Sequence, residues 1–468
     1  MFVGRSDELD TLERLYSIDK FQLVVIHGRR RVGKTTLIKE FIKDKPAIFF
    51  VANEANDYIN IEMFSKKVYE YFNMPSSIGS FGDWNNAFDF IFEKAKESRI
   101  ILVIDEFPYA AAENKSLKSI LQNTIDHKLQ NTNLFMILCG SQVSFMENEV
   151  LGHKSPLFGR RTAQLKIEGF DYYDAAKMIK SYSNEDKIKL FSCIGGTPHY
   201  LSLINPSLGF DSNIKELFFD VSGYLYDEPM MLLRQELREP AMYNSIISAI
   251  AAGASRLNEI ATKIGESTSK TIKYIDTLRN LNILNKSFPF GENPANSRKG
   301  IYKVSDNCFN FWYRYVFPNK QGIEQGVGQA VAEKEVFPSL STYIGKPPFE
   351  NICLQYVMRQ NKQYALPFVA TSFGNWWGND RQKKKQADVD VIAANKAEKK
   401  ILLGECKWKS SFDDVAEIEA LINKEYLFPG FAEYHYMFFS KKEYSKAACK
   451  MSNKHKNLDL INMDMLYA

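Results

Sequence analysis

The feature that most constrains the fold is a glycine-rich loop near the N-terminus. Residues 27–36 read HGRRRVGKTT, in which four residues separate Gly28 from Gly33, and Lys34 and Thr35 follow directly. The preceding run, FQLVVIHG, is continuously apolar, as expected of a buried strand. The following run, TTLIKEFIK, has its apolar residues at helical spacing. The sequence therefore predicts a strand, a loop and a helix in succession.

A loop of this composition at this place is typical of a nucleotide phosphate site. Its glycines let backbone N–H groups approach the phosphates, and the N-terminus of the helix adds a partial positive charge. Lys34 would reach the terminal phosphates and Thr35 would offer its hydroxyl to Mg²⁺. We expect ATP and Mg²⁺ as ligands, bound by Gly28, Gly33, Lys34, Thr35 and Thr36.

Two further buried strands are predicted to end in polar residues. RIILVIDEF ends at Asp105 and Glu106, of which the first would fix Mg²⁺ and the second would polarise the attacking water. NLFMILCGSQ ends at Ser141 and Gln142. Because ligands of open parallel sheets bind at the carboxyl ends of the strands, Ser141 is either a sensor of the γ-phosphate or part of a simple strand-to-helix turn.

Several motifs of the first half resemble those of the archaeal-type ATPases, from the STAND branch of the AAA+ NTPases. They are FVGRSDELDTL, the phosphate loop, LVIDEF, CGSQ, PLFGRRT and GGTPHYL. The resemblance implies an AAA+-like P-loop ATPase with a helical lid. It also implies that Pro198 contacts the base and that Arg160 or Arg161 faces the γ-phosphate. Both arginines follow a glycine in a loop, so an ion pair with a surface carboxylate is the alternative.

The middle of the chain, from Glu239 to Phe290, changes to short amphipathic helices punctuated by glycines. Ser267 is placed to cap the third helix, and two strands around a loop rich in Gly, Pro and Asn follow. Three helices and a hairpin predict a winged helix-turn-helix. Its basic residues could contact DNA phosphates, or the domain could serve for packing within the chain: Lys270, Lys273, Arg279, Arg298 and Lys299.

The last third carries a second set of chemically suggestive residues. Glu350 opens an amphipathic helix, and ADVDVIAA reads as a strand with Asp388 and Asp390 on one face. A turn through NKAEKK returns the chain along ILLGECKW, where Glu405 and Lys407 share a face. Because antiparallel partners bring the two charged sets together, the carboxylates would repel one another unless a cation lay among them.

This spacing is what a PD-(D/E)xK nuclease core needs. Asp390 and Glu405, with Glu350, would bind Mg²⁺, and Lys407 would orient or deprotonate the attacking water. The domain commonly joined to archaeal-type ATPases is similar, through IGKPPFE, FGNWWG, DVDVIA and GECKW. The alternative is a surface hairpin with an ordinary Glu–Lys ladder.

Basic residues also cluster beside two adjacent tryptophans. RQKKKQ, residues 381–386, follows shortly after Trp376 and Trp377. Lysines and aromatic rings together are typical of a surface that holds a nucleic-acid backbone, although a solvated loop would explain the charges alone. The net charge of +4 is too small to decide the matter.

Length and composition set the domain organisation. At about 150 residues per domain, 468 residues predict several domains. We expect an α/β fold with three modules: a P-loop ATPase with its lid over 1–235, a winged helix over 236–310 and an α/β restriction-endonuclease-like domain over 311–468. No apolar run could cross a bilayer. The cysteines are scattered singly and predict reduced, buried thiols of a cytoplasmic protein: Cys139, Cys193, Cys308, Cys353, Cys406 and Cys449.

The expected function is ATP-regulated binding of DNA, with metal-dependent cleavage at the C-terminal carboxylates. The alternative is a nucleotide-driven switch in which ATP rearranges the domains and the nuclease-like domain only binds a partner. ATP and DNA are the expected partners, and a membrane is not. A nucleotide-dependent homo-oligomer is compatible with the sequence, which does not fix the number of subunits.

Overall fold

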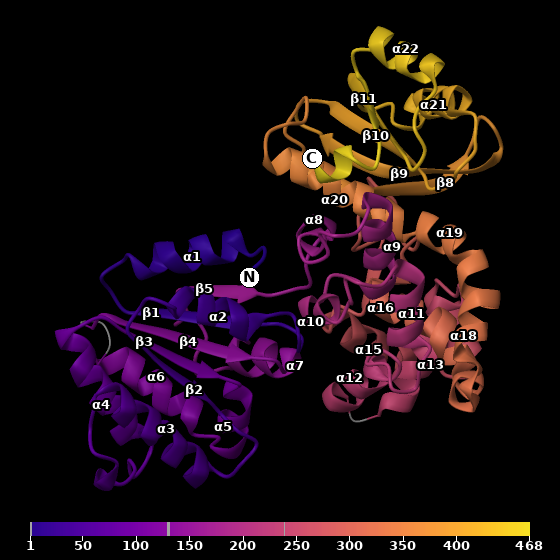
Figure 1. The fold of residues 1–468 in the computed structure, drawn as a ribbon. Helices are drawn as coiled ribbons and strands as arrows, with labels where there is room; N and C mark the ends of the chain where they lie inside the picture. The colour runs from indigo at the N-terminus through magenta and orange to yellow at the C-terminus, as the bar shows by residue number, and fades with distance from the viewer. Residues whose placement is uncertain (1, 129–131, 238) are drawn as a thin grey trace. The chain divides into compact units, whose positions relative to one another are not determined.

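The computed structural model describes residues 2–128, 132–237 and 239–468, and the chain groups into two compact units (Figure 1). Unit 1 comprises Met1–Gly169 together with Thr197–His199. Unit 2 comprises Phe170–Gly196 together with Tyr200–Ala468. The division into three modules stays a prediction.

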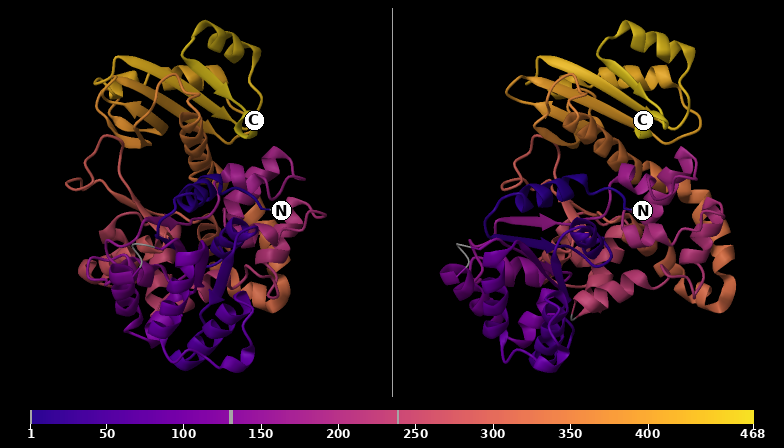
Figure 2. Two further views of the ribbon diagram at one scale, coloured as in Figure 1. Left: turned by 90° about the vertical axis from the view of Figure 1, so that its left-hand side faces the viewer. Right: turned by 60° about the vertical axis from the view of Figure 1, so that its left-hand side comes forward.

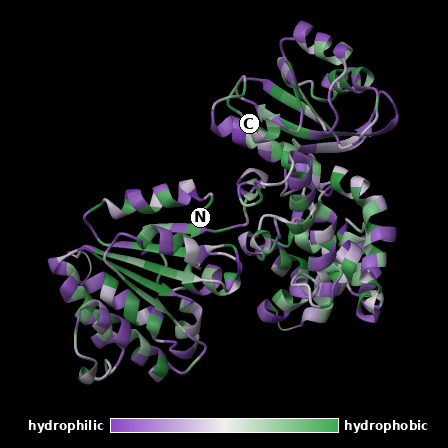
Figure 3. Ribbon diagram, in the orientation of Figure 1, coloured by the Kyte–Doolittle hydropathy of each residue, from purple (hydrophilic) through white to green (hydrophobic). Residues whose placement is uncertain are grey.

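Unit 1 is built on a parallel sheet of five strands in the order β2-β3-β4-β1-β5. The central strands β1, β3 and β4 are buried along their whole length, because their largely apolar sequences meet helices on both faces. The hydropathy colouring shows these strands as an apolar layer (Figure 3). The strands are β1 (Gln22–His27), β2 (Ala47–Val51), β3 (Ile100–Asp105), β4 (Leu134–Gly140) and β5 (Ala163–Lys166).

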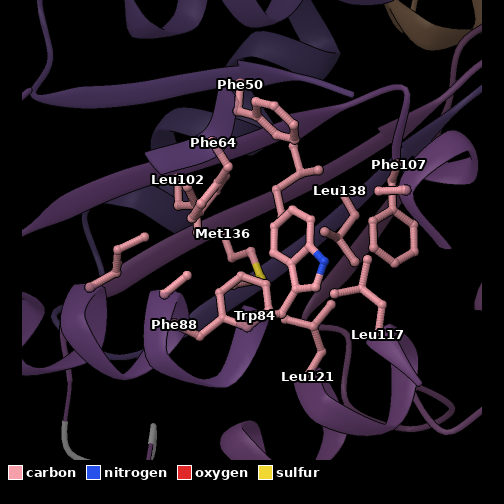
Figure 4. Packing of buried hydrophobic residues seen from close by; sticks show 14 of the residues in the cluster. Phe50, Phe64, Trp84, Phe88, Leu102, Phe107, Leu117, Leu121, Met136 and Leu138 are labelled. Carbon is pink, nitrogen blue, oxygen red and sulfur yellow. The ribbon is translucent and has the colours of Figure 1, made fainter. Parts of the chain in front are cut away.

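Helices cover both faces of this sheet (Figures 1 and 2). One face packs against α1 and α2, and the other packs against α3 to α6, around an aromatic cluster. In that cluster the centre of the Trp84 ring lies 5.1 Å from the centre of the Phe64 ring and 5.6 Å from that of the Phe88 ring (Figure 4). The helices are α1 (Ser6–Tyr16), α2 (Lys34–Ile42), α3 (Asp57–Tyr71), α4 (Trp84–Glu97), α5 (Phe107–Glu113), α6 (Leu117–Lys128) and the short α7 (Val143–Phe145).

The strand order places the predicted polar residues at one edge. Strand β4 lies between β3 and β1, so its end is flanked by the ends of both. The phosphate loop follows β1, Asp105 ends β3, and Ser141 follows β4 directly. Because all these strands run parallel, the three polar segments meet at the carboxyl edge of the sheet.

Unit 2 begins with helices that pack against residues far away in the sequence. The backbone N–H of Tyr172 donates to Oε1 of Gln355 at 3.0 Å, and its hydroxyl donates to the carbonyl of Leu466 at 2.7 Å. The hydroxyl of Tyr343 donates to the carbonyl of Ser192 at 3.1 Å. These helices are α8 (Tyr172–Ala176), α9 (Asn184–Ile194), α10 (Pro198–Ser202, which starts in unit 1), α11 (Phe210–Phe218) and α12 (Glu228–Glu236).

Three mutually packed helices and a hairpin follow, as the middle of the sequence predicts. They are α13 (Pro240–Ala251), α14 (Leu257–Ile264), α15 (Thr268–Asn280), β6 (Leu284–Ser287) and β7 (Ile301–Val304). Strands β6 and β7 pair antiparallel. The predicted cap of the third helix is confirmed, because the Ser267 side chain accepts a hydrogen bond from the Lys270 N–H.

The C-terminal part of unit 2 is a mixed sheet in the order β12-β11-β10-β9-β8. Strand β9 pairs antiparallel with β8 and with β10, while β10, β11 and β12 run parallel. Helix α20 contacts β8, β9 and β10, whereas α21 contributes to the core on which the sheet packs. The strands are β8 (Ser372–Asp380), β9 (Lys385–Asn395), β10 (Lys400–Lys407), β11 (Glu433–Ser440) and β12 (Leu458–Ile461).

The helices that complete unit 2 connect the hairpin to this sheet and cover it. They are α16 (Asn307–Phe311), α17 (Lys320–Gly322), α18 (Gly328–Val331), α19 (Phe337–Gly345), α20 (Pro348–Lys362), α21 (Asp414–Ile422) and α22 (Lys446–Lys454).

Two expectations from composition can be compared with the structure. Five of the six cysteines are buried as expected, but Cys449, on α22, is exposed. Within the described ranges, no helix combines the length and the apolar character that crossing a membrane would require.

Candidate functional site

The phosphate loop of unit 1 has the backbone that its glycines permit. Gly28 and Gly33 have φ values of 154° and 90°. A methyl group at Gly28 would lie 2.1 Å from the carbonyl oxygen of Ile167, so no larger residue fits there. Gly33 is the N-cap of α2 and has no side chain that could lie between the N-terminus of this helix and a phosphate. Thr36 lies exposed in the first turn of this helix.

The side chain of Lys34 is folded back onto the loop. Its Nζ donates to the carbonyl oxygens of Gly28 and Arg29, both at 2.9 Å. The side chain is buried, so its charge lies in a low-dielectric setting where an anion would interact with it strongly. Phosphate oxygens could replace the two carbonyls as acceptors.

The two residues predicted to hold Mg²⁺ beside the nucleotide are in direct contact. Thr35 Oγ1 donates to Oδ2 of Asp105 at 2.8 Å, across seventy residues of sequence. Oδ1 of Asp105 accepts from the N–H of Glu106 at 2.9 Å, which fixes the carboxylate at the end of β3. A hydroxyl and a carboxylate in contact are an oxygen donor set that suits Mg²⁺, so the residues present fit this cation.

Ser141 holds the side chain of Glu106. Its hydroxyl and its N–H donate to Oε2 of Glu106 at 2.8 Å and 3.2 Å. Glu106 has a φ of 52°, in the left-handed region, and Ser141 is buried. Two donors on one carboxylate oxygen fix the orientation of the group. Ser141 lies in the turn between β4 and α7, and its contact with the γ-phosphate stays a prediction.

The Ser141→Ala variant tests this arrangement. We expect kcat for ATP hydrolysis to fall about tenfold, because one hydrogen bond to a charged group is lost, while the Kd for ATP stays unchanged. Steady-state phosphate release and calorimetric titration measure the two quantities, with Ser141→Thr as the variant that keeps the hydroxyl. Weaker binding of ATP but not of ADP would instead indicate contact with the γ-phosphate.

The two arginines proposed to face the γ-phosphate differ in their surroundings. Arg160 forms a two-pronged ion pair with Asp126, through Nε at 2.7 Å and Nη2 at 2.6 Å. Its Nη1 donates to the carbonyls of Pro156 and Phe158. Arg160 would have to release Asp126 before it could reach a phosphate. Arg161 is half-buried.

Pro198 lies beside the phosphate loop within unit 1. A methyl group placed on Gly33 would be 3.8 Å from Cγ of Pro198, and the N–H of His199 donates to the Arg31 carbonyl at 3.4 Å. The segment Thr197–His199 therefore packs against the loop, although its neighbours on both sides belong to unit 2. Contact of Pro198 with the base of a bound nucleotide stays a prediction.

In unit 2, Asp390 of the C-terminal sheet lies near enough to Glu405 and Glu350 to interact with them electrostatically. Oδ2 of Asp390, on β9, accepts from the N–H of Cys406 on β10 at 2.9 Å. Burial and the negative charges of Glu405 and Glu350 raise the pKa of Asp390 to about 8. The predicted hairpin is thus present, and helix α20 adds Glu350 to it.

Lysines pair with these carboxylates. Lys407 and Lys424 contact the two oxygens of Glu405 at 2.8 Å and 2.7 Å. Lys346 lies 3.3 Å from Glu350 and 2.8 Å from Asp388. Lys407 also contacts Glu417 at 3.0 Å. Burial by itself would lower the pKa of Lys407, but Glu405 and Glu417 outweigh it and raise that pKa.

The chemistry of these carboxylates suits a metal ion, but their arrangement in the structure does not form a metal site. Oxygen donors and mutual repulsion both favour a hard cation such as Mg²⁺ or Mn²⁺. Across the part of the chain that the structure describes, however, no group of three or more potential ligands is drawn together to hold an ion. Lys424 and Lys346 would have to turn away for Glu405 and Glu350 to bind one.

Sequence reasoning missed part of the C-terminal cluster. Lys346 lies four residues before Glu350 but in the turn between α19 and α20, outside the helix that carries Glu350, so helical spacing does not predict their contact. Lys424 comes nineteen residues after Glu405, and their contact has no signal in the sequence either. Of the two neighbouring tryptophans, Trp376 has a structural role. The centres of its ring and of the Phe428 ring are 5.8 Å apart, and Trp376 packs against the core of the sheet.

The basic residues of the middle segment are largely paired with nearby acids. Lys270 contacts Glu266 at 2.7 Å, and Arg279 contacts Asp276 at 2.9 Å. Lys299 contacts Glu292 at 2.6 Å, and Lys273 is exposed on α15. Exposed pairs of this kind are weak, so these side chains remain able to exchange an acid for a phosphate.

Comparison with protein families places both ends of the chain. Residues 2–204 match an ATPase domain found predominantly in Archaea. Residues 312–418 match a family of archaeal and bacterial proteins of unknown function. The middle segment lies between the two matches.

Two proteins of Methanocaldococcus jannaschii are similar in sequence. The uncharacterised protein MJECL04 is 31% identical over 449 residues, which cover 95% of this chain and 97% of that protein. The uncharacterised ATP-binding protein MJ0423 is 53% identical over 45 residues, 10% of this chain and 76% of that protein. The first similarity extends over nearly the whole of both chains.

A solved structure supports the fold. The Walker-type ATPase PABY2304 of Pyrococcus abyssi aligns with a TM-score of 0.52 and 18% sequence identity. The alignment covers 67% of this chain and 96% of that one. At this identity the likeness concerns the fold alone.

Proposed function

The chain belongs to one family with the uncharacterised protein MJECL04 and carries, over residues 2–204, an ATPase domain of the kind found predominantly in Archaea; from that premise we propose that it uses ATP to regulate the binding and metal-dependent cleavage of DNA. In this proposal unit 1 binds and hydrolyses ATP, and the carboxylates of the C-terminal sheet act on a phosphodiester. The three helices and the β6–β7 hairpin, which this proposal takes as a winged helix, contribute phosphate contacts.

The nucleotide half rests on the contact between Thr35 and Asp105. Lys34 exchanges the loop carbonyls for phosphate oxygens, and the N–H groups of the loop and of α2 bind the remaining phosphate charge. Glu106 accepts the proton of the attacking water, in the orientation that Ser141 gives it. Mg²⁺ held by Thr35 and Asp105 would supply positive charge to the phosphates.

The nuclease half rests on the electrostatic interaction of Asp390 with Glu405 and Glu350 and on the contact of Lys407 with Glu405. Lys407 lies at the end of β10 beside Glu405, where its ammonium can orient a water for attack on phosphorus. Mg²⁺ or Mn²⁺ held by the three carboxylates would supply a Lewis acid to the phosphodiester. The electrostatic repulsion felt by Asp390 supports a cation at this place.

One observation favours a second function, in which the C-terminal domain binds a partner and does no chemistry. Lysines already contact both oxygens of Glu405 and one oxygen of Glu350. A site whose carboxylates are neutralised within the chain has less need of a metal. The chain would then be a nucleotide-driven switch.

A cleavage assay separates the two functions. Purified protein is incubated with plasmid and oligonucleotide DNA, with Mg²⁺, Mn²⁺ or EDTA, and with or without ATP. We expect cleavage that requires the metal and changes in rate with ATP, because the proposed water activation needs the cation and ATP is proposed to regulate the C-terminal site. DNA binding without cleavage under every condition would favour the switch.

A further inference from the structure

The β6–β7 hairpin of unit 2 is anchored on the outer strand of the C-terminal sheet. The N–H of Phe290, in the loop of the hairpin, donates to the carbonyl of Asn375 on β8 at 2.8 Å. The Phe290 side chain packs against the hydrophobic core of that sheet. Figure 2 shows the hairpin, in salmon, reaching the orange sheet in both views. The hairpin is therefore built into the C-terminal domain and is not a free wing.

The anchored hairpin brings Lys303 to the carboxylates. Nζ of Lys303, on β7, lies 5.7 Å from the centre of the Trp377 ring, and Trp377 is paired in register with Asp388 on β9. Burial lowers the pKa of Lys303, Glu350 and Asp390 oppose this shift, and Lys346 adds to it. The ammonium group of Lys303 thus interacts electrostatically with Glu350 and Asp390, two of the carboxylates of the candidate metal site.

Lys303 differs from the other lysines of this cluster. Lys346, Lys407 and Lys424 each form an ion pair with a carboxylate of the cluster. Lys303 forms no ion pair with any described residue and lies over an aromatic face instead. Its half-buried charge is the one that the cluster leaves for a ligand.

Charge balance indicates the sign of that ligand. Five carboxyl groups, those of Glu350, Asp388, Asp390, Glu405 and Glu417, stand against the four lysines 303, 346, 407 and 424. Any divalent cation added to this cluster makes its net charge positive. The cluster then attracts an anion, and a phosphodiester is an anion that also ranks among the best acceptors for a lysine.

We propose that Lys303 is a positioning residue of the C-terminal site, which holds one backbone phosphate of the nucleic acid beside the carboxylates. This inference rests on the proposed nucleic-acid function. It makes the site a composite, in which the hairpin supplies the phosphate anchor while β9, β10 and α20 supply the carboxylates. The aromatic face of Trp377 keeps the stem of Lys303 in place.

The test measures DNA affinity as a function of salt with Ca²⁺ present, and a gel of the recovered duplex checks that no cleavage intervenes. Lys303→Met keeps the length of the stem and removes the charge. We expect its Kd for a labelled duplex to rise about three- to tenfold, and the slope of log K against log salt to shrink by about one. Lys303→Arg should restore both values. Lys396→Met, an exposed lysine at the opposite end of β9, is the matched control and should leave both unchanged.

The outcomes distinguish this inference from the function it rests on. If the wild type binds DNA and Lys303→Met has the same Kd and slope, the role of Lys303 is rejected and the proposed function stands. If Lys303→Arg is as weak as Lys303→Met while both keep the thermal unfolding midpoint of the wild type, the role is likewise rejected. If the wild type binds neither duplex nor single strand at low salt, both proposals are rejected.

Discussion

Replacing Lys34 by Ala is expected to abolish ATP hydrolysis and to weaken ATP binding by at least about a hundredfold, since charge-assisted hydrogen bonds to phosphate are lost at a buried position. Calorimetric titration with ATP and steady-state phosphate release measure the two effects. Lys39→Ala is the matched control, because Lys39 is exposed on the same helix. It should bind and hydrolyse ATP as the wild type does.

A companion variant separates binding from hydrolysis. Glu106→Gln keeps the shape of the side chain but removes its ability to accept a proton, so ATP binding should persist while kcat falls by about a hundredfold or more. The Thr35–Asp105 contact is not altered by this change. An unchanged ATPase rate in the Lys34 variant would refute the assignment of the phosphate loop.

The second large effect is expected at the C-terminal carboxylates. Asp390→Ala removes a proposed metal ligand, so metal-dependent DNA cleavage should fall by about a hundredfold or more and Mn²⁺ binding at this site should weaken. Lys407→Ala should lose cleavage to a similar extent but retain Mn²⁺ binding, because the proposed partner of its ammonium is the water. Gel assays of plasmid cleavage and titration with Mn²⁺ measure these changes.

Both variants should keep the ATPase rate of the wild type, since Asp390 and Lys407 lie in unit 2 and the phosphate loop lies in unit 1. Glu398→Ala is the control, because Glu398 is an exposed carboxylate at the turn between β9 and β10. Cleavage that is equally fast in the Asp390 variant would assign the activity to another site or to a contaminant.

The parts of the fold that the sequence predicts are those with a local cause. Residues 22–42 form the expected strand, loop and helix, because apolar runs and glycines act over a few residues. The contact between Thr35 and Asp105 joins distant residues, yet it follows from the rule that parallel strands end at one edge. The β9–β10 hairpin follows similarly from strand alternation on both sides of a polar turn.

The parts that could not be predicted depend on tertiary packing. The hydrogen bond from the Ser141 hydroxyl to Glu106 depends on the rotamers of two side chains that follow neighbouring strands. The approach of Lys303 to the carboxylates depends on how the hairpin docks against β8, which no periodicity encodes. Arg160 shows why a motif alone does not assign a role. An arginine after a glycine in a loop can form an ion pair with a surface carboxylate, as Arg160 does with Asp126, or it can act on a phosphate.

The chain crosses between the two units at Gly169, at Gly196 and again at His199, and this has a practical consequence for dissecting the protein. A fragment that stops at Gly169 retains the whole five-stranded sheet but lacks Thr197–His199, the segment that packs on the phosphate loop. A fragment that includes this segment must also carry residues 170–196, whose packing partners lie elsewhere in unit 2. Nucleotide binding should therefore be studied in the full-length protein, with single substitutions in place of truncations.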